Sequence, residues 1–232
     1  MDYRQVLQAR ENRKTRKNHI AKPLDNFFHT FDQCWDAGSK YLEGGIDSEY
    51  ASLIERSIII STVTAIEVYY RDMLDFVFKY CSPKFFEPKL KFLHPQKYDI
   101  LELRDIYSHD IHPLELVSNN LSFQNVEQIE KVFSHFFIKN GFWDSVKNQQ
   151  VRRKDKPKKI YSWTSYDLEC LKDTFNLRHE LIHDPAHITF LTENILANLA
   201  GAAYMVWGSD FILTNMIVVN KDPNLENENS KQ

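Results

Sequence analysis

A run of residues without proline or glycine, 50–80, constrains the fold more than any other part of the chain. Its apolar residues recur at intervals of three and four, as they do on one face of an α-helix. The three consecutive isoleucines at 58–60 would suit a strand. Strands rarely exceed about ten residues, however, and this run is about three times longer. The pattern therefore predicts one long, central, buried helix.

The composition favours helices throughout the chain. Only six glycines and eight prolines occur among 232 residues, of which 43% are hydrophobic. Glycine is too scarce for a turn-rich β-sandwich or a protein with glycine-rich nucleotide-binding loops. A chain of this length is expected to form one sizeable core. We therefore predict a single all-α domain, built as a helical bundle, over residues 21–219.

Further helices are predicted where apolar residues keep helical spacing. A capping box formed by Thr164 and Asp167 begins another helix, which continues into the segment around Arg178. Proline at position 185 is expected to end that helix just after His183. The remaining predicted helices cover residues 24–42, 98–107, 121–137 and 190–210.

Three polar segments flank or interrupt the predicted bundle. Residues 1–20 form a basic N-terminal segment without the apolar run of a secretory signal peptide. Residues 147–160 carry seven basic residues, one acidic residue and little apolar periodicity, which predicts a mobile basic loop. Residues 220–232 are polar and are predicted to form a disordered tail.

The cysteines and the longest apolar stretch bear on location. Three widely spaced cysteines suggest neither a disulfide framework nor a metal knuckle, so a reducing cytoplasm is expected. The apolar stretch at 195–217 is interrupted by asparagine, serine and aspartate residues, which argues against a membrane span. We therefore expect a cytoplasmic protein that makes no contact with a membrane.

One short segment, residues 178–183 with the sequence R-H-E-L-I-H, matches two catalytic patterns. Read from its first histidine, it is the H-E-x-x-H helix of zinc peptidases. His179 and His183 would share one helical face and bind the ion, with Glu180 as general base. A third ligand is less evident, because the nearest following glutamate, Glu193, comes only ten residues after His183.

Read from its arginine, the same segment suits RNA cleavage without a metal ion. Histidine can transfer protons to and from ribose oxygens, and arginine can neutralise charge on the phosphoryl group. Arg178 and His183 lie about 140° apart around the predicted helix, so one copy of the helix makes a poor site. Two such helices facing each other across a two-fold axis could bring both residues into a shared cleft.

Residues 176–184 resemble the motif of the HEPN family, in which an arginine is followed by Asn, Asp or His and, a few positions later, by a histidine. Residues 64–71 also resemble part of the long helix that precedes this motif in HEPN domains. The resemblance implies a helical bundle that forms a symmetric dimer and acts as a metal-independent endoribonuclease. Such proteins often serve toxin–antitoxin or antiviral defence systems, so an antitoxin or regulatory protein is a further expected partner.

The resemblance also implies roles for individual residues. Arg178 and His183 would be the catalytic pair, with His179 as the auxiliary polar residue. Glu67 would support them by orienting the arginine, and Glu180 is the other supporting candidate. No cofactor or metal is expected. The candidate RNA-binding residues lie in the basic segment and are Arg152, Arg153, Lys154, Lys158 and Lys159.

Two other interpretations remain open. The first is a non-catalytic HEPN-like module that binds RNA or protein, in which Arg178 and the histidines have structural or surface roles. The second is a zinc hydrolase that uses the H-E-x-x-H segment. Sensitivity to chelators and the effect of replacing His183 would separate these alternatives from the ribonuclease.

Overall fold

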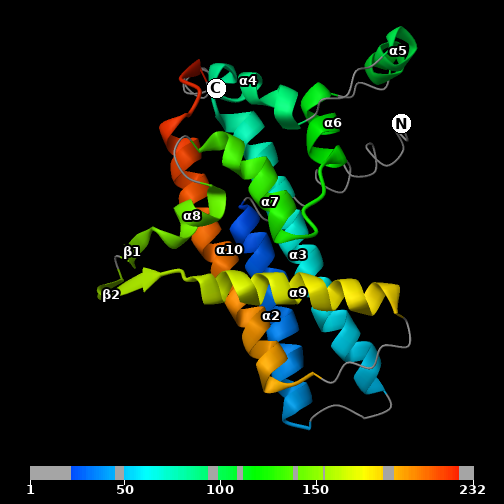
Figure 1. Cartoon of the computed structure of the whole chain (residues 1–232), viewed down its shortest axis with the longest axis vertical. Coiled ribbons are helices and arrows are strands. Elements are labelled where there is room, and N and C mark those ends of the chain that lie inside the picture. The colour runs from blue at the N-terminus through cyan, green and yellow to red at the C-terminus, as the bar shows by residue number, and fades with distance from the viewer. Residues whose placement is uncertain are drawn as a thin grey trace, which may run out of the picture.

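The computed structural model describes residues 22–44, 50–93, 99–108, 112–137, 141–153, 155–184 and 191–224. The basic segment 1–20 and residues 225–232 of the predicted tail lie outside the described residues. The described residues form a mainly helical structure with a single two-stranded sheet, which confirms the all-α class (Figure 1).

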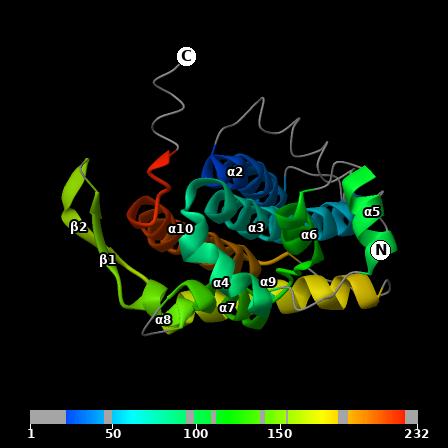
Figure 2. The same ribbon diagram turned by 90° about the horizontal axis from the view of Figure 1, so that it is seen from above.

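The run without proline or glycine forms helix α3, Ala51–Tyr80, as predicted. It lies beside α10, Glu193–Val219, and these two helices are placed between α2, Pro23–Leu42, and α9, Ser165–His183 (Figure 2). Helix α9 crosses the other three (Figure 1). Buried side chains from all four helices form a common core.

Aromatic residues of α3 connect this core to the rest of the molecule. The ring of Tyr69 contacts Phe27 of α2, with centroids 6.2 Å apart. The hydroxyl of the next residue, Tyr70, shares a hydrogen bond with the hydroxyl of Ser209 in α10 at 2.9 Å. The ring of Tyr70 also packs against an aromatic cluster from residues 123–143, which consists of Phe123, Phe133, Phe142 and Trp143.

The connection between α3 and α9 contains more helices than we predicted. The predicted helix at 98–107 is confirmed as α5, Ile100–Ser108. Two others, α4 (Pro83–Leu93) and α6 (Pro113–Asn120), were missed because their first residues are prolines. Proline is well tolerated in the first turn of a helix, where its missing N–H would have no partner in any case. These prolines begin helices and do not interrupt them.

The helix predicted at 121–137 is shorter than expected. Helix α7, Val126–Phe133, begins after Asn125, whose side chain accepts a hydrogen bond from the Gln128 N–H at 2.8 Å. It continues into a short 3-10 helix, η2, Ser134–Phe136. Helix α8, Phe142–Lys147, follows and leads to the basic segment.

The basic segment is not a loop, so that prediction is wrong. Its described residues form an antiparallel hairpin of β1, Gln150–Arg153, and β2, Lys156–Ser162 (Figure 1). The hairpin is anchored at its base, where the indole N–H of Trp163 donates to the Tyr204 carbonyl at 2.7 Å. Trp163 is buried against α10 close to Gly208, where a β-carbon would approach the indole to 2.6 Å.

Helix α10 extends beyond the predicted range of 190–210. Among the described helices, it is the one that is long and apolar enough to cross a membrane by length and composition. The same is true of many core helices in water-soluble proteins, and α10 packs against α2, α3 and α9. The cytoplasmic location therefore stays a prediction.

Candidate active site on helix α9

Helix α9 carries the whole R-H-E-L-I-H segment, as predicted. It starts at the expected capping box, in which the backbone N–H and the hydroxyl of Thr164 donate to the Asp167 carboxylate at 2.7 and 2.8 Å. It ends at His183, and the N–H of Asp184 closes the last turn by donating to the Glu180 carbonyl at 2.9 Å. The proline that we expected to end it lies outside the described residues.

Arg178 points toward α3. Its Nη2 atom lies 3.7 Å from Oε1 of Glu67, and the two side chains are 21% and 13% exposed. Burial raises the pKa of the Glu67 carboxyl, while the positive charges of Arg178 and Arg71 oppose that shift. The structure thus brings together the two residues that were predicted to act as catalytic arginine and supporting acid.

This ion pair is incompletely hydrogen-bonded. Nε of Arg178 and Oε1 of Glu67 are buried, and neither has a hydrogen-bond partner among the described residues. Buried polar atoms in folded proteins nearly always have such partners, because leaving them without one is unfavourable. The pair therefore lacks two of the hydrogen bonds that a fully satisfied arginine–carboxylate pair makes.

His179 and His183 lie on a different face of α9 and are both exposed. Their ring centroids are 4.3 Å apart, as expected for residues one helical turn apart. Imidazole is the side chain best suited to proton transfer near neutral pH. The exposed pair can therefore donate and accept protons at the surface, although Arg178 of the same chain faces elsewhere.

Two residues of α3 that the sequence analysis missed hold the end of α9 and the residue that leads into α10. The Arg56 guanidinium donates to the carbonyl of Leu181, a buried residue between the two histidines. The neighbouring Glu55, only 2% exposed, accepts a hydrogen bond from the Leu191 N–H at 2.7 Å. A glutamate among the apolar positions of the predicted helix at 50–80 was the one available signal for this role.

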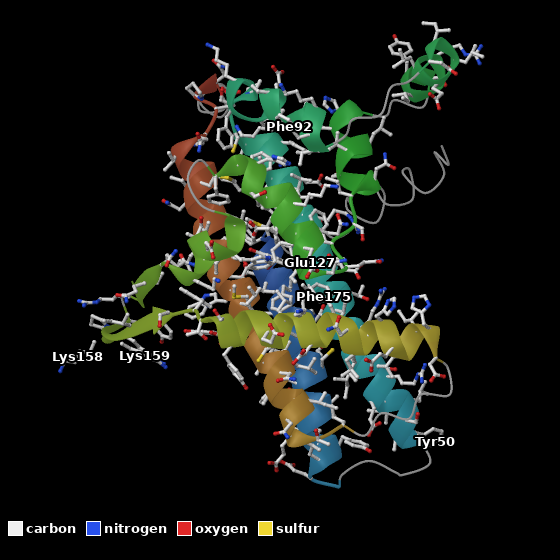
Figure 3. All side chains as sticks on the ribbon, viewed as in Figure 1. Tyr50, Phe92, Glu127, Lys158, Lys159 and Phe175 are labelled. Atoms are coloured by element: carbon white, nitrogen blue, oxygen red, sulfur yellow. The ribbon has the colours of Figure 1, made fainter. Side chains whose placement is uncertain are left out.

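The candidate RNA-binding residues lie at the other end of α9. Arg152, Lys158 and Lys159 are exposed on the hairpin that precedes α9. Figure 3 shows Lys158 and Lys159 on β2. Lys154 and the side chain of Arg153 lie outside what the structure describes. Because α9 rises about 1.5 Å per residue, roughly 27 Å separates its first residue from His183. Within one chain, the structure does not bring the basic residues next to the candidate catalytic residues.

The described residues give limited support to a metal site at the H-E-x-x-H segment. The two histidines are close enough to share an ion, and Glu180 is exposed beside them. Among the described residues, no group of three or more His, Cys, Asp or Glu side chains is arranged to hold a metal ion. A third ligand would have to come from elsewhere.

Comparisons with family models, with curated proteins and with solved structures found no match for this chain. The function must therefore be inferred from the chain's own residues.

Proposed function

We propose that the chain is a HEPN-type endoribonuclease that cleaves RNA without a metal ion, at a site shared between two copies of the chain. One observation carries this proposal: α9 holds Arg178, paired with Glu67 of α3, on one face and an exposed histidine pair on another. Arg178 and both histidines lie in the segment that resembles the HEPN motif. The pairing of Arg178 with Glu67 is the arrangement expected if the acid orients the arginine.

The chemistry assigns one task to each side chain. The ribose 2′-oxygen attacks the neighbouring phosphorus, and the 5′-oxygen leaves with a proton. His183 exchanges protons with these oxygens, with His179 beside it, while Arg178 neutralises the charge that develops on the phosphoryl oxygens. Cleavage by this route leaves a 2′,3′-cyclic phosphate on one product and a 5′-hydroxyl on the other.

The arrangement of α9 supports a site formed by two chains. Around the helix axis, Ile182 lies between Arg178 on one side and the two histidines on the other. Its side chain is 43% exposed, although it is apolar. A second α9 helix packing on Ile182 across a two-fold axis would bring its own histidines toward the Arg178 of the first chain. The incompletely hydrogen-bonded pair would then gain polar neighbours.

The same proposal extends to the setting in which the enzyme works. An endoribonuclease with exposed catalytic histidines needs restraint in the cell that makes it. We therefore propose a role in toxin–antitoxin or antiviral defence in the cytoplasm, with an antitoxin or regulatory protein as a partner. RNA is the substrate, and the basic hairpin contributes contacts to its phosphates.

The decisive experiment compares His183→Ala with His29→Ala, which removes an exposed histidine from α2. Cleavage of labelled RNA is measured in single-turnover reactions that contain EDTA. We expect the parent and His29→Ala to give equal rates and cyclic-phosphate ends, and His183→Ala to be slower by roughly a thousandfold. Equal rates for all three proteins would exclude His183 from catalysis.

The second candidate function is a zinc hydrolase, and the 4.3 Å separation of the two imidazole rings is the observation that favours it. Under this alternative, EDTA would abolish activity and added zinc would restore it. A chain that binds RNA but cleaves nothing under either condition would be the non-catalytic module.

A further inference from the structure

A pocket of about 350 Å³ lies between α2 and α10, away from the candidate catalytic residues. Its volume is in the range of sites that hold small molecules or parts of larger ones. Ala200 and Ala203 of α10 leave the room that larger side chains would fill. The walls consist of five aromatic residues and one carboxylate, Phe28, Phe31, Trp35, Tyr204, Trp207 and Asp32.

The aromatic walls are held in place by contacts with one another and with the end of the hairpin. In α2, the ring of Phe31 contacts Phe28 and Trp35, at 6.4 and 6.2 Å between centroids. In α10, Tyr204 and Trp207 are 5.6 Å apart, and the Tyr204 hydroxyl donates to the Ser162 carbonyl at 3.2 Å. Because these contacts fix the rings before anything binds, a planar ligand can enter with little reorganisation.

The pocket is continuous with the basic hairpin. Trp207, which forms one wall, contacts the ring of Tyr161 on β2, with centroids 5.0 Å apart. The ammonium group of Lys159 lies 4.8 Å from the centre of the same Tyr161 ring. The hairpin stands beside α10 (Figure 2), and Lys159 is thereby joined through Tyr161 to the Trp207 wall of the pocket. A cationic surface adjoining stacked aromatic rings is the combination that single-stranded nucleic acids bind.

We propose that this pocket receives one unstacked base of a single-stranded RNA, while the hairpin lysines contact the adjoining phosphates. The inference rests on the proposed function, since it takes RNA as the ligand. Every base has a flat face that can stack on Trp35 or Trp207. A base inside a duplex cannot enter, so single-stranded regions are the substrate class.

Asp32 gives the pocket a preference among bases. An ionised carboxylate accepts hydrogen bonds and donates none. Cytosine, adenine and guanine each carry an exocyclic amino group that can donate to it, whereas uracil has only ring N–H donors. The pocket therefore favours an amino-bearing base over uracil.

The test measures affinity by fluorescence anisotropy with labelled twelve-nucleotide oligocytidine and oligouridine, using the full chain with His183→Ala to prevent cleavage. Added to this background, Trp35→Ala should weaken oligocytidine binding by roughly tenfold. It should leave binding of a duplex of the same length unchanged. The matched control is Tyr107→Ala, which removes an exposed aromatic residue from α5 and should have no effect.

A second variant keeps the test independent of any packing effect at Trp35. Asp32→Asn should reduce the preference for oligocytidine over oligouridine, while Asp36→Asn, an exposed neighbour on α2, should preserve it. If neither Trp35→Ala nor Asp32→Asn alters affinity or preference, the pocket is not a base site. Loss of binding on neutralising Lys158 and Lys159 would still support RNA as the ligand.

The two proposals can therefore fail separately. A parent protein that shows the base preference but cleaves RNA no faster than His183→Ala would retain the pocket and overturn the nuclease. A parent protein that binds neither oligonucleotide would overturn both.

Discussion

The guanidinium of Arg178 lies 3.7 Å from the carboxylate of Glu67, so the end of α9 is bound by charge to the middle of α3. The contact joins two helices that are far apart in the sequence. It places the arginine beside a carboxylate, while Nε of Arg178 has no hydrogen-bond partner among the described residues. An orienting acid of this kind should affect catalysis as well as stability.

Replacing Glu67 with Gln tests that expectation. The substitution removes the negative charge beside Arg178, so we expect the single-turnover cleavage rate to fall by about tenfold or more. Stability should fall as well, by roughly 1–3 kcal/mol, because Arg178 is left partly buried without its counter-ion, so the rate is measured where both proteins are fully folded. The control is Glu169→Gln, which breaks an exposed ion pair with Lys172 on the same helix. A large loss of stability without a loss of rate would make Glu67 structural.

A site shared between two chains predicts complementation. Arg178→Ala and His183→Ala proteins should each be inactive, whereas a mixture with exchanged subunits should recover about a quarter of the parent activity. Half of the dimers in such a mixture combine the two variants, and each of these has one of its two sites intact. Activity and native mass are measured on the same sample.

The control mixture combines His183→Ala with the double variant and should stay inactive. If mixed dimers form but no activity returns, Arg178 and His183 act within one chain. A protein that is monomeric and fully active would also contradict the shared site.

The main helices could be predicted because their signals are local. Helices α2 and α3 begin and end within a few residues of the predicted ranges, since each repeats its apolar residues along a single face. The start of α9 was equally predictable, because Thr164 and Asp167 are only three residues apart. Capping hydrogen bonds and helical periodicity both depend on residues that are close together in the sequence, so the sequence alone can reveal them.

The hairpin could not be predicted, because its stabilising partners lie on another element. Trp163 packs beside Gly208, and Gln149 donates a hydrogen bond to the Gly208 carbonyl at 2.6 Å. Neither contact leaves a pattern within the lysine-rich segment itself. For the same reason, the sequence revealed neither the aromatic pocket between α2 and α10 nor the hydrogen bond from Arg56 to the Leu181 carbonyl near the end of α9.

Neutralising the exposed hairpin cations, Arg152, Lys158 and Lys159, should weaken RNA binding and leave the rate at saturating RNA unchanged. For each phosphate that the variant no longer binds, the slope of log affinity against log salt should fall by roughly one. The distance of the hairpin from His183 is the physical reason for the unchanged rate. Affinity is measured at several salt concentrations, and neutralising the exposed Lys84 and Lys91 of α4 is the control. An unchanged salt slope would place the phosphates elsewhere.

Asp210 should make the stability of the fold depend on pH. Burial raises the pKa of its carboxyl from 3.8 to about 6, although the Tyr69 hydroxyl donates to it at 3.3 Å. The folded state therefore holds this proton more tightly than the unfolded chain. As pH rises from about 4 to 6, the unfolding free energy falls on account of this group and stays lower above that window.

Asp210→Asn removes the buried charge, so the unfolding free energy of this variant should not show the fall that Asp210 causes as pH rises. We expect the variant to match the parent most closely below about pH 4 and to exceed it by roughly 1–3 kcal/mol near pH 7, apart from a constant offset due to the altered hydrogen bonds with Tyr69 and Thr214. Urea unfolding at several pH values measures the difference. The exposed Asp36→Asn on α2 should show no such dependence. A constant difference between Asp210→Asn and the parent from pH 4 to 8 would mean that Asp210 keeps the ordinary pKa of an aspartate in the folded protein.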